Sequence, residues 1–365
     1  MKYTKQILIA MAGLLTVACS NDSEIGENQA NNSSQEPVEI KLGSSLNATT
    51  RAYNLTQGNV IATGQTVYAW IDDAGSTSPS VAASEYVKGW TLTAAAPASA
   101  GAPQALNSVG TTKYYFPSTG RNINIYALHG NFNNSVTDGS TTWATFSSSL
   151  THSVEANQHT AGNYEKSDLF CAHLLNQSKS STTLQLPFKH VLSKIEVYLF
   201  RGVGVTAADL AGISSITLKN PVLTGTVSLT KPTATTANVA SVAVPSTSNK
   251  GDITMKLQTK TTGENMSSDA PSTGFSPADN DKKAYALGEA VIIPQTIGTP
   301  GTTPVTADFI SVNFSVGGSL VAKVAQTFAA GTKYTYFIIV NRTGLQLTAT
   351  LADWTSGSII AGEAQ

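Results

Sequence analysis

Alternating apolar and polar residues along most of the chain predict β-strands rather than helices. Successive side chains of a strand point to opposite faces of a sheet, so a strand with one buried face alternates in polarity. The clearest runs are VEIKL (38–42), TVYAWI (66–71), KYYFP (113–117), RNINIYAL (121–128), ISSITLKN (213–220), KYTYFIIV (333–340) and LQLTATL (345–351). Turn-forming residues separate these runs. The pattern therefore predicts an all-β fold built from β-sandwiches.

One pair of runs carries its own turn. FISVNFSV and SLVAKVAQTF, within 309–328, flank Gly317 and Gly318, and glycine readily adopts the positive φ angles of a two-residue turn. We expect an antiparallel hairpin there. Helical periodicity is nearly absent, and the candidate helix is TAADLAG, with Thr206 as its N-cap and Gly212 at its end.

The first residues are typical of an export signal. Lys2 and Lys5 precede an apolar run, 7–17, which is too short to span a bilayer. The run ends in VACS, where small Ala18 precedes Cys19, and this is a lipoprotein-type cleavage site. We predict that Cys19 becomes the N-terminus and carries acyl chains such as palmitate. Ordinary secretion with cleavage nearby is the alternative.

The chain divides by composition into four parts. The polar, acidic stretch after the cysteine cannot bury enough apolar surface to order itself, so it predicts a solvated tether. The remainder is long enough for two domains of ordinary size, and the polar stretch QSKSSTT (177–183) lies near its middle. We expect a signal peptide with the lipidated cysteine (1–19), a tether (20–36), an N-terminal β-sandwich (37–182) and a C-terminal β-sandwich (183–365).

Charge and cysteine content narrow the class of protein. The formal net charge is -1 and only 12% of residues are charged, which gives no reason to expect a nucleic-acid partner. Cys19 and Cys171 are the two cysteines. If Cys19 is acylated, Cys171 has no partner in the chain, and an intramolecular disulfide is not expected. The composition is typical of a neutral extracellular β-protein.

Histidine and cysteine offer weak metal-site candidates. His152 and His159 bracket Glu155, but a loop with solvated side chains is the favoured interpretation. Cys171 and His173 would share one strand face, yet a zinc site needs two more ligands. A small buried thiol is therefore the better explanation of Cys171.

Catalytic constellations are equally weak. His190 stands among apolar residues and fits a hydrogen-bonded structural histidine. Asp72 and Asp73 begin DDAG, which has the composition of a turn. Asp353 could act as an acid, but a glycosidase needs a second carboxylate across a cleft. The sequence contains neither a G-x-S-x-G elbow nor a P-loop. We expect no enzyme activity, no cofactor and no metal.

Aromatic residues raise the possibility of glycan binding. The candidates for stacking on a sugar ring are Tyr53, Tyr68, Trp70, Trp90 and Trp143. We expect Tyr68 and Trp70, two residues apart on one strand, to share a face in the core. Trp90 and Trp143 lie in polar stretches and are the more open candidates.

Several segments together resemble the Bacteroidota fimbrillin family, in its major-fimbria-like branch. The matching segments are the lipobox around the cysteine, the strand that ends in ATTRA, VYAWIDDAG, KYYFPSTGRNINIYAL, DLFCAHLLNQSKSSTTLQLPFKHVLSKIEVYL, VIIPQT, AGTKYTYFIIVNRTGLQLTATLADW and the closing GE. The resemblance implies two tandem transthyretin-like (Greek-key) β-sandwich domains without catalysis. It also implies export as an outer-membrane lipoprotein precursor and a final place in a cell-surface fimbria.

The resemblance gives Arg51 a role. It implies cleavage between Arg51 and Ala52 by an arginine- or trypsin-like protease. Arg51 is an isolated cation among small, flexible residues, which suits entry of its side chain into a protease pocket.

Cleavage would then act as an assembly switch. It would release the strand that contains Val38, Ile40 and Leu42, and would leave an apolar groove with an unpaired edge. A C-terminal run of the next subunit could fill this groove and extend a head-to-tail polymer. The alternating candidates for this donor strand are Leu345, Leu347, Ala349 and Leu351. The tail SIIAGEAQ (358–365) is the other donor candidate.

Three hypotheses follow. The first is a fimbrial structural subunit, with other subunits, a processing protease and a host or bacterial surface ligand as partners; within it, a tip or anchor role remains an alternative to a shaft role. The second is a lipid-anchored, monomeric glycan-binding surface protein. The third is an exported hydrolase.

Overall fold

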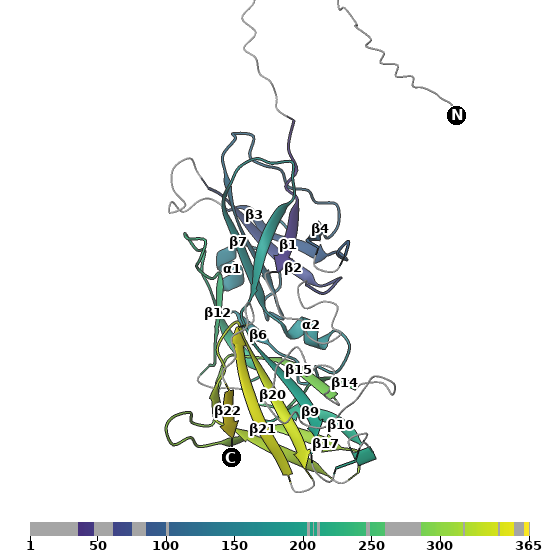
Figure 1. Cartoon of the computed structure of the whole chain (residues 1–365). Coiled ribbons are helices and arrows are strands. Elements are labelled where there is room, and N and C mark those ends of the chain that lie inside the picture. The colour runs from purple at the N-terminus through teal and green to yellow at the C-terminus, as the bar shows by residue number, and fades with distance from the viewer. Residues whose placement is uncertain are drawn as a thin grey trace, which may run out of the picture. The chain divides into compact units, whose positions relative to one another are not determined.

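The computed structural model describes the backbone of residues 36–46, 61–74, 85–99, 102–202, 205–206, 208–209, 212–245, 249–259, 286–316, 318–341, 344–353 and 361–364. These residues form β-sheets with two short helices between strands (Figure 1). The chain from Pro37 onward forms one compact unit. No helix in the described ranges has the length and apolar character that crossing a membrane requires. The all-β prediction is confirmed.

The first half of this unit forms a closed barrel. Its strands are β1 (Leu42–Leu46), β2 (Thr66–Asp73), β3 (Glu85–Ala94), β4 (Gln104–Ser108), β5 (Ile123–His129), β7 (Phe170–Gln177) and β8 (Leu184–His190). The hydrogen-bonded order is β1-β4-β3-β2-β5-β7-β8. The order closes because β1 pairs antiparallel with β4 and parallel with β8. The alternating pattern predicts strands but does not distinguish a closed order from an open sandwich.

The second half contains the remaining sheets. One strand that precedes this half in sequence, β6 (Thr151–Ser153), takes part in these sheets. The other strands are β9 (Ser193–Arg201), β10 (Ile213–Leu218), β11 (Thr224–Leu229), β12 (Ala240–Ala243), β13 (Ile253–Thr254), β14 (Lys256–Thr259), β15 (Ala286–Ile292), β16 (Thr296–Ile297), β17 (Ala307–Phe314), β18 (Ser319–Val324), β19 (Gln326–Thr327), β20 (Thr332–Asn341), β21 (Gly344–Asp353) and β22 (Ala361–Ala364). They form sheets in the orders β14-β15-β9-β20-β21-β22, β13-β10-β17-β18, β12-β11-β6 and β16-β19.

Two short helices were not predicted from the sequence. They are α1 (Trp143–Ser147) and α2 (Asn163–Ser167). Thr142 caps α1, since its hydroxyl accepts a hydrogen bond from the Thr145 N–H at 3.1 Å. Trp143 and Phe146, three residues apart on one face of α1, are both buried. The helix is therefore held by apolar packing as well as by its cap.

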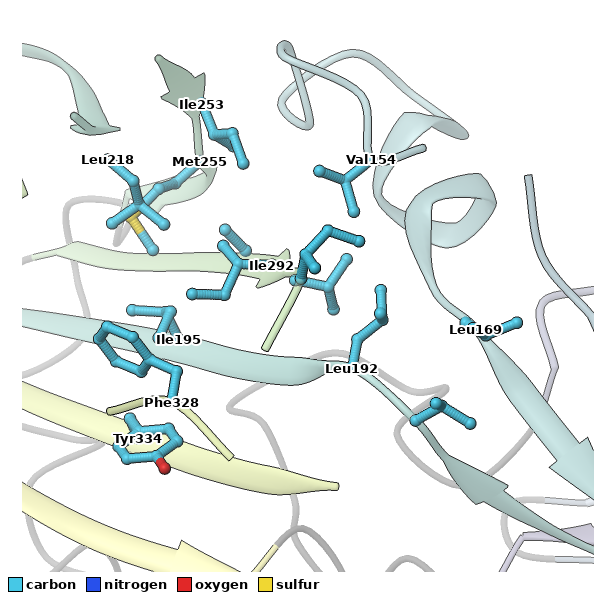
Figure 2. Close-up of a cluster of buried hydrophobic side chains, with 14 of the residues drawn as sticks. Val154, Leu169, Leu192, Ile195, Leu218, Ile253, Met255, Ile292, Phe328 and Tyr334 are labelled. Atoms are coloured by element: carbon cyan, nitrogen blue, oxygen red, sulfur yellow. The ribbon is translucent and has the colours of Figure 1, made fainter. Parts of the chain in front are cut away.

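Two apolar clusters fill the interior. One contains only residues between 40 and 188 and lies inside the barrel. The other draws on both halves of the chain. Figure 2 shows part of the second cluster, where Ile195 of β9, Ile292 of β15 and Phe328 converge. Packing thus joins the two predicted halves, and β6 of the first half also pairs with β11 of the second. β8 (Leu184–His190) belongs to the barrel although it follows the predicted boundary at 182/183, and the division of the chain there stays a prediction.

Local predictions had mixed outcomes. The predicted hairpin is present as β17 and β18, but Asn313 pairs with Ser319, so the connection is longer than two residues. Gly317 lies outside the described residues. KYYFP contributes only an isolated bridge, Tyr115 to Glu39. Thr206 accepts a hydrogen bond from the Asp209 N–H at 3.2 Å, as an N-cap would.

Candidate functional site

Residues 38–46, which we name the first strand segment, are held by backbone hydrogen bonds on both sides. The Ile40 N–H donates to the Tyr114 carbonyl at 2.8 Å, and the Phe116 N–H donates to the Val38 carbonyl at 2.9 Å. The segment then continues as β1, between β4 and β8. Its backbone therefore completes the hydrogen bonding of the barrel.

Side chains of this segment alternate between the barrel interior and solvent. Ile40 and Leu42 are 1% and 2% exposed and belong to the barrel cluster, while Val38 packs against it half-buried. Lys41 between them is exposed. Burying an Ile or Leu side chain fully stabilises a fold by about 2 kcal/mol. The apolar alternation predicted for this segment is thus present, and it closes the barrel core.

Polar contacts fix the register of the segment. The Ser44 hydroxyl, 1% exposed, donates to Gln104 Oε1 at 3.1 Å, and Gln104 Nε2 donates to the Ile61 carbonyl at 2.8 Å. A Cβ on Gly43 would lie 2.6 Å from Gln185 Oε1 and 3.0 Å from the Gln104 carbonyl. The Gln185 side chain can move aside, but the Gln104 carbonyl belongs to the backbone, so a side chain placed here by a shift of one residue would fit tightly.

The residues predicted for lipidation and cleavage lie outside the described part of the chain. These are Cys19, Arg51 and Ala52. The described part of the first strand segment ends at Leu46, five positions before Arg51. The predicted cleavage position therefore follows directly on a strand that is built into the barrel.

The candidate donor strand lies in β21. Leu345, Leu347, Ala349 and Leu351 occupy alternate positions of this strand, so they share one face of it. In register they stand opposite Val340, Ile338, Tyr336 and Tyr334 of β20. On its other side β21 pairs with β22. In this structure, therefore, the strand completes its own sheet.

The metal-site candidates do not converge. His152, predicted to be a solvated loop residue, is fully buried on β6, and that prediction is wrong. Its Nδ1 accepts from the Asn131 N–H at 3.1 Å and its Nε2 donates to the Ser167 carbonyl at 2.9 Å. His159 is exposed. Among the described residues, no group of three or more His, Cys, Asp or Glu side chains could hold a metal ion.

The two tryptophans predicted to be open are buried instead. Trp90 lies in β3, is 4% exposed and donates through Nε1 to the Ser108 hydroxyl at 3.0 Å. Trp143 is 8% exposed and meets Trp70 edge to face, with ring centroids 5.3 Å apart. Neither presents an open face for a sugar ring, which corrects the expectation. Tyr53 lies outside the described residues.

Other predicted core residues behave as expected. Tyr68 and Trp70 share a face of β2, and both rings contact Phe146. Cys171 is buried with a free thiol. His190 Nδ1 lies 3.0 Å from Asp168 Oδ2, and the His190 side chain is only 7% exposed.

Asp72 departs from its predicted place in a turn. It belongs to β2, is 5% exposed and pairs with Lys231 Nζ at 2.7 Å. Burial raises the pKa of Asp72, although the Lys231 ammonium opposes this shift. Lys231 also lies 3.4 Å from Glu85 and over the rings of Tyr126 and Trp143. This contact ties the second half of the chain to the barrel.

A buried cluster of charged side chains was not predicted from the sequence. Lys194 Nζ lies 2.8 Å from Glu196 Oε1 and 3.6 Å from Glu289 Oε1, and Lys333 Nζ lies 3.3 Å from Glu196 Oε2. Burial raises the pKa of Glu289 to about 7, although Lys194 opposes this shift. The residues stand on adjacent strands β15, β9 and β20. Two lysines face two carboxyl groups, so the charges balance when Glu289 is ionised, and we interpret the cluster as a structural network.

Comparison with known proteins shows the family to which this chain belongs. A family model described as fimbrillin-like matches residues 50–354. The chain belongs to the fimbrillin-like family. Membership indicates a fimbrial or adhesive role at the cell surface, in association with other fimbrial subunits. A search of curated proteins found no match.

Solved structures share the fimbrillin-like fold of the chain. A candidate cell adhesion protein from Bacteroides ovatus is 13% identical, with a TM-score of 0.56, and the match covers 87% of this chain and 98% of that one. A second, from Bacteroides uniformis, is 15% identical, with a TM-score of 0.51 and the same coverage of 87% and 98%. At these identities the similarity establishes a common fold.

Proposed function

We propose that this fimbrillin-like chain is a structural subunit of a cell-surface fimbria that supports adhesion. It is exported as a lipoprotein through Cys19 and held at the outer membrane until an arginine- or trypsin-like protease cuts between Arg51 and Ala52. Cleavage releases the first strand segment. Subunits then polymerise head to tail by strand exchange.

The position of the first strand segment supports this proposal most directly. The segment ends five positions before Arg51 in sequence and fills the place between β4 and β8. Its loss would leave the facing edges of both strands without backbone partners, and unpaired edges readily accept another strand. It would also uncover the apolar side chains that Ile40 and Leu42 cover. Both changes favour insertion of a strand from another molecule.

The register contacts indicate what an inserted strand must supply. Apolar side chains are needed at the positions of Ile40 and Leu42, and a small residue is favoured at the position of Gly43. Leu345, Leu347, Ala349 and Leu351 provide the apolar alternation, but β21 would have to leave its own sheet to donate them. The tail at 358–365 is the alternative donor, and it contains Gly362.

Replacement of Arg51 in the producing cell tests the proposal. We expect Arg51→Ala to abolish cleavage, so that intact mass shows an acylated Cys19 as the N-terminus and gels show no ladder of oligomers. Arg121→Ala is the matched control, because Arg121 is half exposed and pairs with Asp73 at 3.1 Å. This variant should be processed and should polymerise like the wild type. A wild-type ladder from Arg51→Ala would contradict the proposal.

The alternatives differ at the N-terminus. A fimbrial anchor or a lipid-anchored, monomeric glycan-binding protein would keep its lipid and its first strand segment. A tip subunit would be trimmed but would use only one end. A wild-type protein that carries acylated Cys19 as its sole N-terminus would favour the anchored forms.

A further inference from the structure

The carboxyl group of Glu289 is buried without the hydrogen bonds that such a group normally has. Its side chain is 2% exposed, and Lys194 Nζ lies 3.6 Å from its Oε1, which is beyond hydrogen-bond distance. Within the described part of the chain, neither oxygen of Glu289 has a hydrogen-bond partner. Buried carboxylates are otherwise hydrogen-bonded, because burial removes the water that would solvate them. Glu289 therefore needs an explanation beyond the balance of charges.

The sheet places an amine and a second carboxyl group beside Glu289. Strands β15, β9 and β20 lie side by side (Figure 1). Glu289 on β15 stands opposite Glu196 on β9. Lys194 precedes Glu196 by two residues, so their side chains share one face of β9, and Lys194 Nζ lies 2.8 Å from Glu196 Oε1. All three side chains are buried. The amine is thus held near two carboxyl groups in a place closed to solvent.

The protonation states of these groups suit a reaction between them. Burial raises the pKa of Glu289 to about 7, so its carboxyl group is protonated in a large part of the molecules near neutral pH. Burial opposes the charge on Lys194, but the carboxylates of Glu196 and Glu289 raise its pKa well above the usual range. A neutral amine therefore forms when Lys194 passes a proton to a carboxylate, and Glu196 is close enough to take it.

A bond between Lys194 and Glu289 would remove two buried charges. Each buried ion loses its hydration, and an ion pair recovers this loss only when its geometry is good. An amide carries no net charge, so it replaces the loose pair at 3.6 Å by a neutral group. Lys333 Nζ, which lies 3.3 Å from Glu196 Oε2, remains as the partner of Glu196. The remaining charges of the cluster then balance.

We propose that Lys194 and Glu289 condense to an amide that cross-links β9 and β15. Lys194 passes a proton to Glu196, and its nitrogen then attacks Glu289 Cδ and forms the C–N bond. One C–O bond of the carboxyl group breaks, and its oxygen leaves as water. This water carries away two of the three ammonium protons, one of them by way of Glu196, so Glu196 ends as it began. The step consumes no oxidant, reductant or cofactor.

The cross-link stabilises the second half of the chain. It closes a loop between residues 194 and 289, which restricts the unfolded chain. It also prevents β9 and β15 from separating under a pulling load, which suits a subunit of an adhesive filament. Because an amide does not titrate, Glu289 affects the dependence of stability on pH only in unlinked chains. The inference goes beyond the proposed function and does not depend on cleavage at Arg51.

Mass spectrometry of the full chain, purified from the producing cell, tests the proposal. After denaturation and digestion with trypsin, we expect the peptide that contains Lys194 to be joined to the peptide that contains Glu289. The mass of this joined species should be lower than the sum of the two by one water, and trypsin should not cut after Lys194. Lys219 and Asp252 are a control within the same molecule, because they form a partly exposed ion pair and should stay unlinked.

Variants test the role of each group. Lys194→Met should abolish the joined species, and Lys219→Met should leave its yield unchanged. Glu196→Gln keeps both reacting groups but removes the proton acceptor, so it should lower the yield by at least about tenfold. The wild-type digest decides the question even if a variant fails to fold. Separate peptides for Lys194 and Glu289 in the folded wild type would overturn the proposal, as would an amide that joins Lys194 to Glu196 or involves Lys333.

Discussion

His152 shows how burial changes the chemistry of one residue. The pKa of its imidazole falls from 6.5 to about 4 because burial removes the hydration that a charged ring needs. Between these values the unfolded chain binds a proton that the folded chain does not bind. This residue therefore contributes full stability above pH 6.5, and the contribution is lost as the pH falls towards 4.

Replacement of His152 should flatten this dependence on pH. We expect the free energy of unfolding of the wild type to lose about 2 kcal/mol through this residue between pH 7 and pH 5. His152→Gln should remove that part of the slope, measured by urea unfolding at both values. His159→Gln, at an exposed histidine, should keep it. Glu289 has the opposite effect, because its raised pKa means that stability falls as the pH rises. The contribution of His152 is therefore measured as the difference in slope between each variant and the wild type. Equal slopes for both variants would refute this account.

Whether a residue is buried was harder to predict than whether it lies in a strand. Trp90 looked open because its neighbours are polar, and the alternation around it is broken. In the structure, Gly89 has a φ of +70°, and the pairing of β2 with β3 shifts register there. The bulge moves the buried positions from Val87 to Trp90, Leu92 and Ala94. A period-2 pattern cannot reveal such a phase change without the partner strand.

The first strand segment has one face in the barrel core and one face in solvent. Ile40 and Lys41 are adjacent, and they face the core and the solvent respectively. We expect Ile40→Ala to destabilise the unprocessed chain by about 2–5 kcal/mol, since it leaves a cavity in the barrel core. Lys41→Ala should cost less than about 0.5 kcal/mol. Chemical unfolding measures both.

Hydrogen exchange at one backbone amide tests whether Ile40 holds the first strand segment in place. The Phe116 N–H donates to Val38, so its protection reports whether the segment is in place. Ile40→Ala should speed its exchange, and Lys41→Ala should not. Unchanged protection in Ile40→Ala would mean that the segment is held by something other than core packing.

Long runs of strand-forming residues were predictable, and short or irregular elements were not. TVYAWI lies in β2 and KYTYFIIV in β20 because both runs are rich in aromatic and β-branched residues, although most positions of each strand are buried rather than alternating. KYYFP has strand-forming residues but pairs only through Tyr115, since its hydrogen-bonding partner is the irregular start of the first strand segment. The closure of the barrel depends on which strands pair, and local patterns do not contain that information.

At the scale of the whole molecule, the two predicted halves are joined by specific contacts. Lys231 of the second half pairs with Asp72 of the barrel. The Gln158 side chain exchanges two hydrogen bonds with the backbone of Val291, at 2.8 and 2.9 Å. These long-range partners could not be identified from the sequence.

We propose that departure of the first strand segment from the barrel permits assembly. A disulfide between Glu39→Cys and Tyr115→Cys can test it, because the two residues face each other across an antiparallel bridge and are partly or fully exposed. The backbone bonds flank this pair, which makes it the closer type, with Cα atoms about 4.5 Å apart. That separation is within disulfide range.

The decisive measurement is the oligomeric state of this double variant after cleavage at Arg51, followed by size-exclusion chromatography with and without reductant. We expect the oxidised, cleaved protein to retain its N-terminal fragment and to stay monomeric. On reduction it should release the fragment and form a ladder of oligomers like the cleaved wild type. Polymerisation of the oxidised, cleaved protein at the wild-type rate would contradict strand release as the switch.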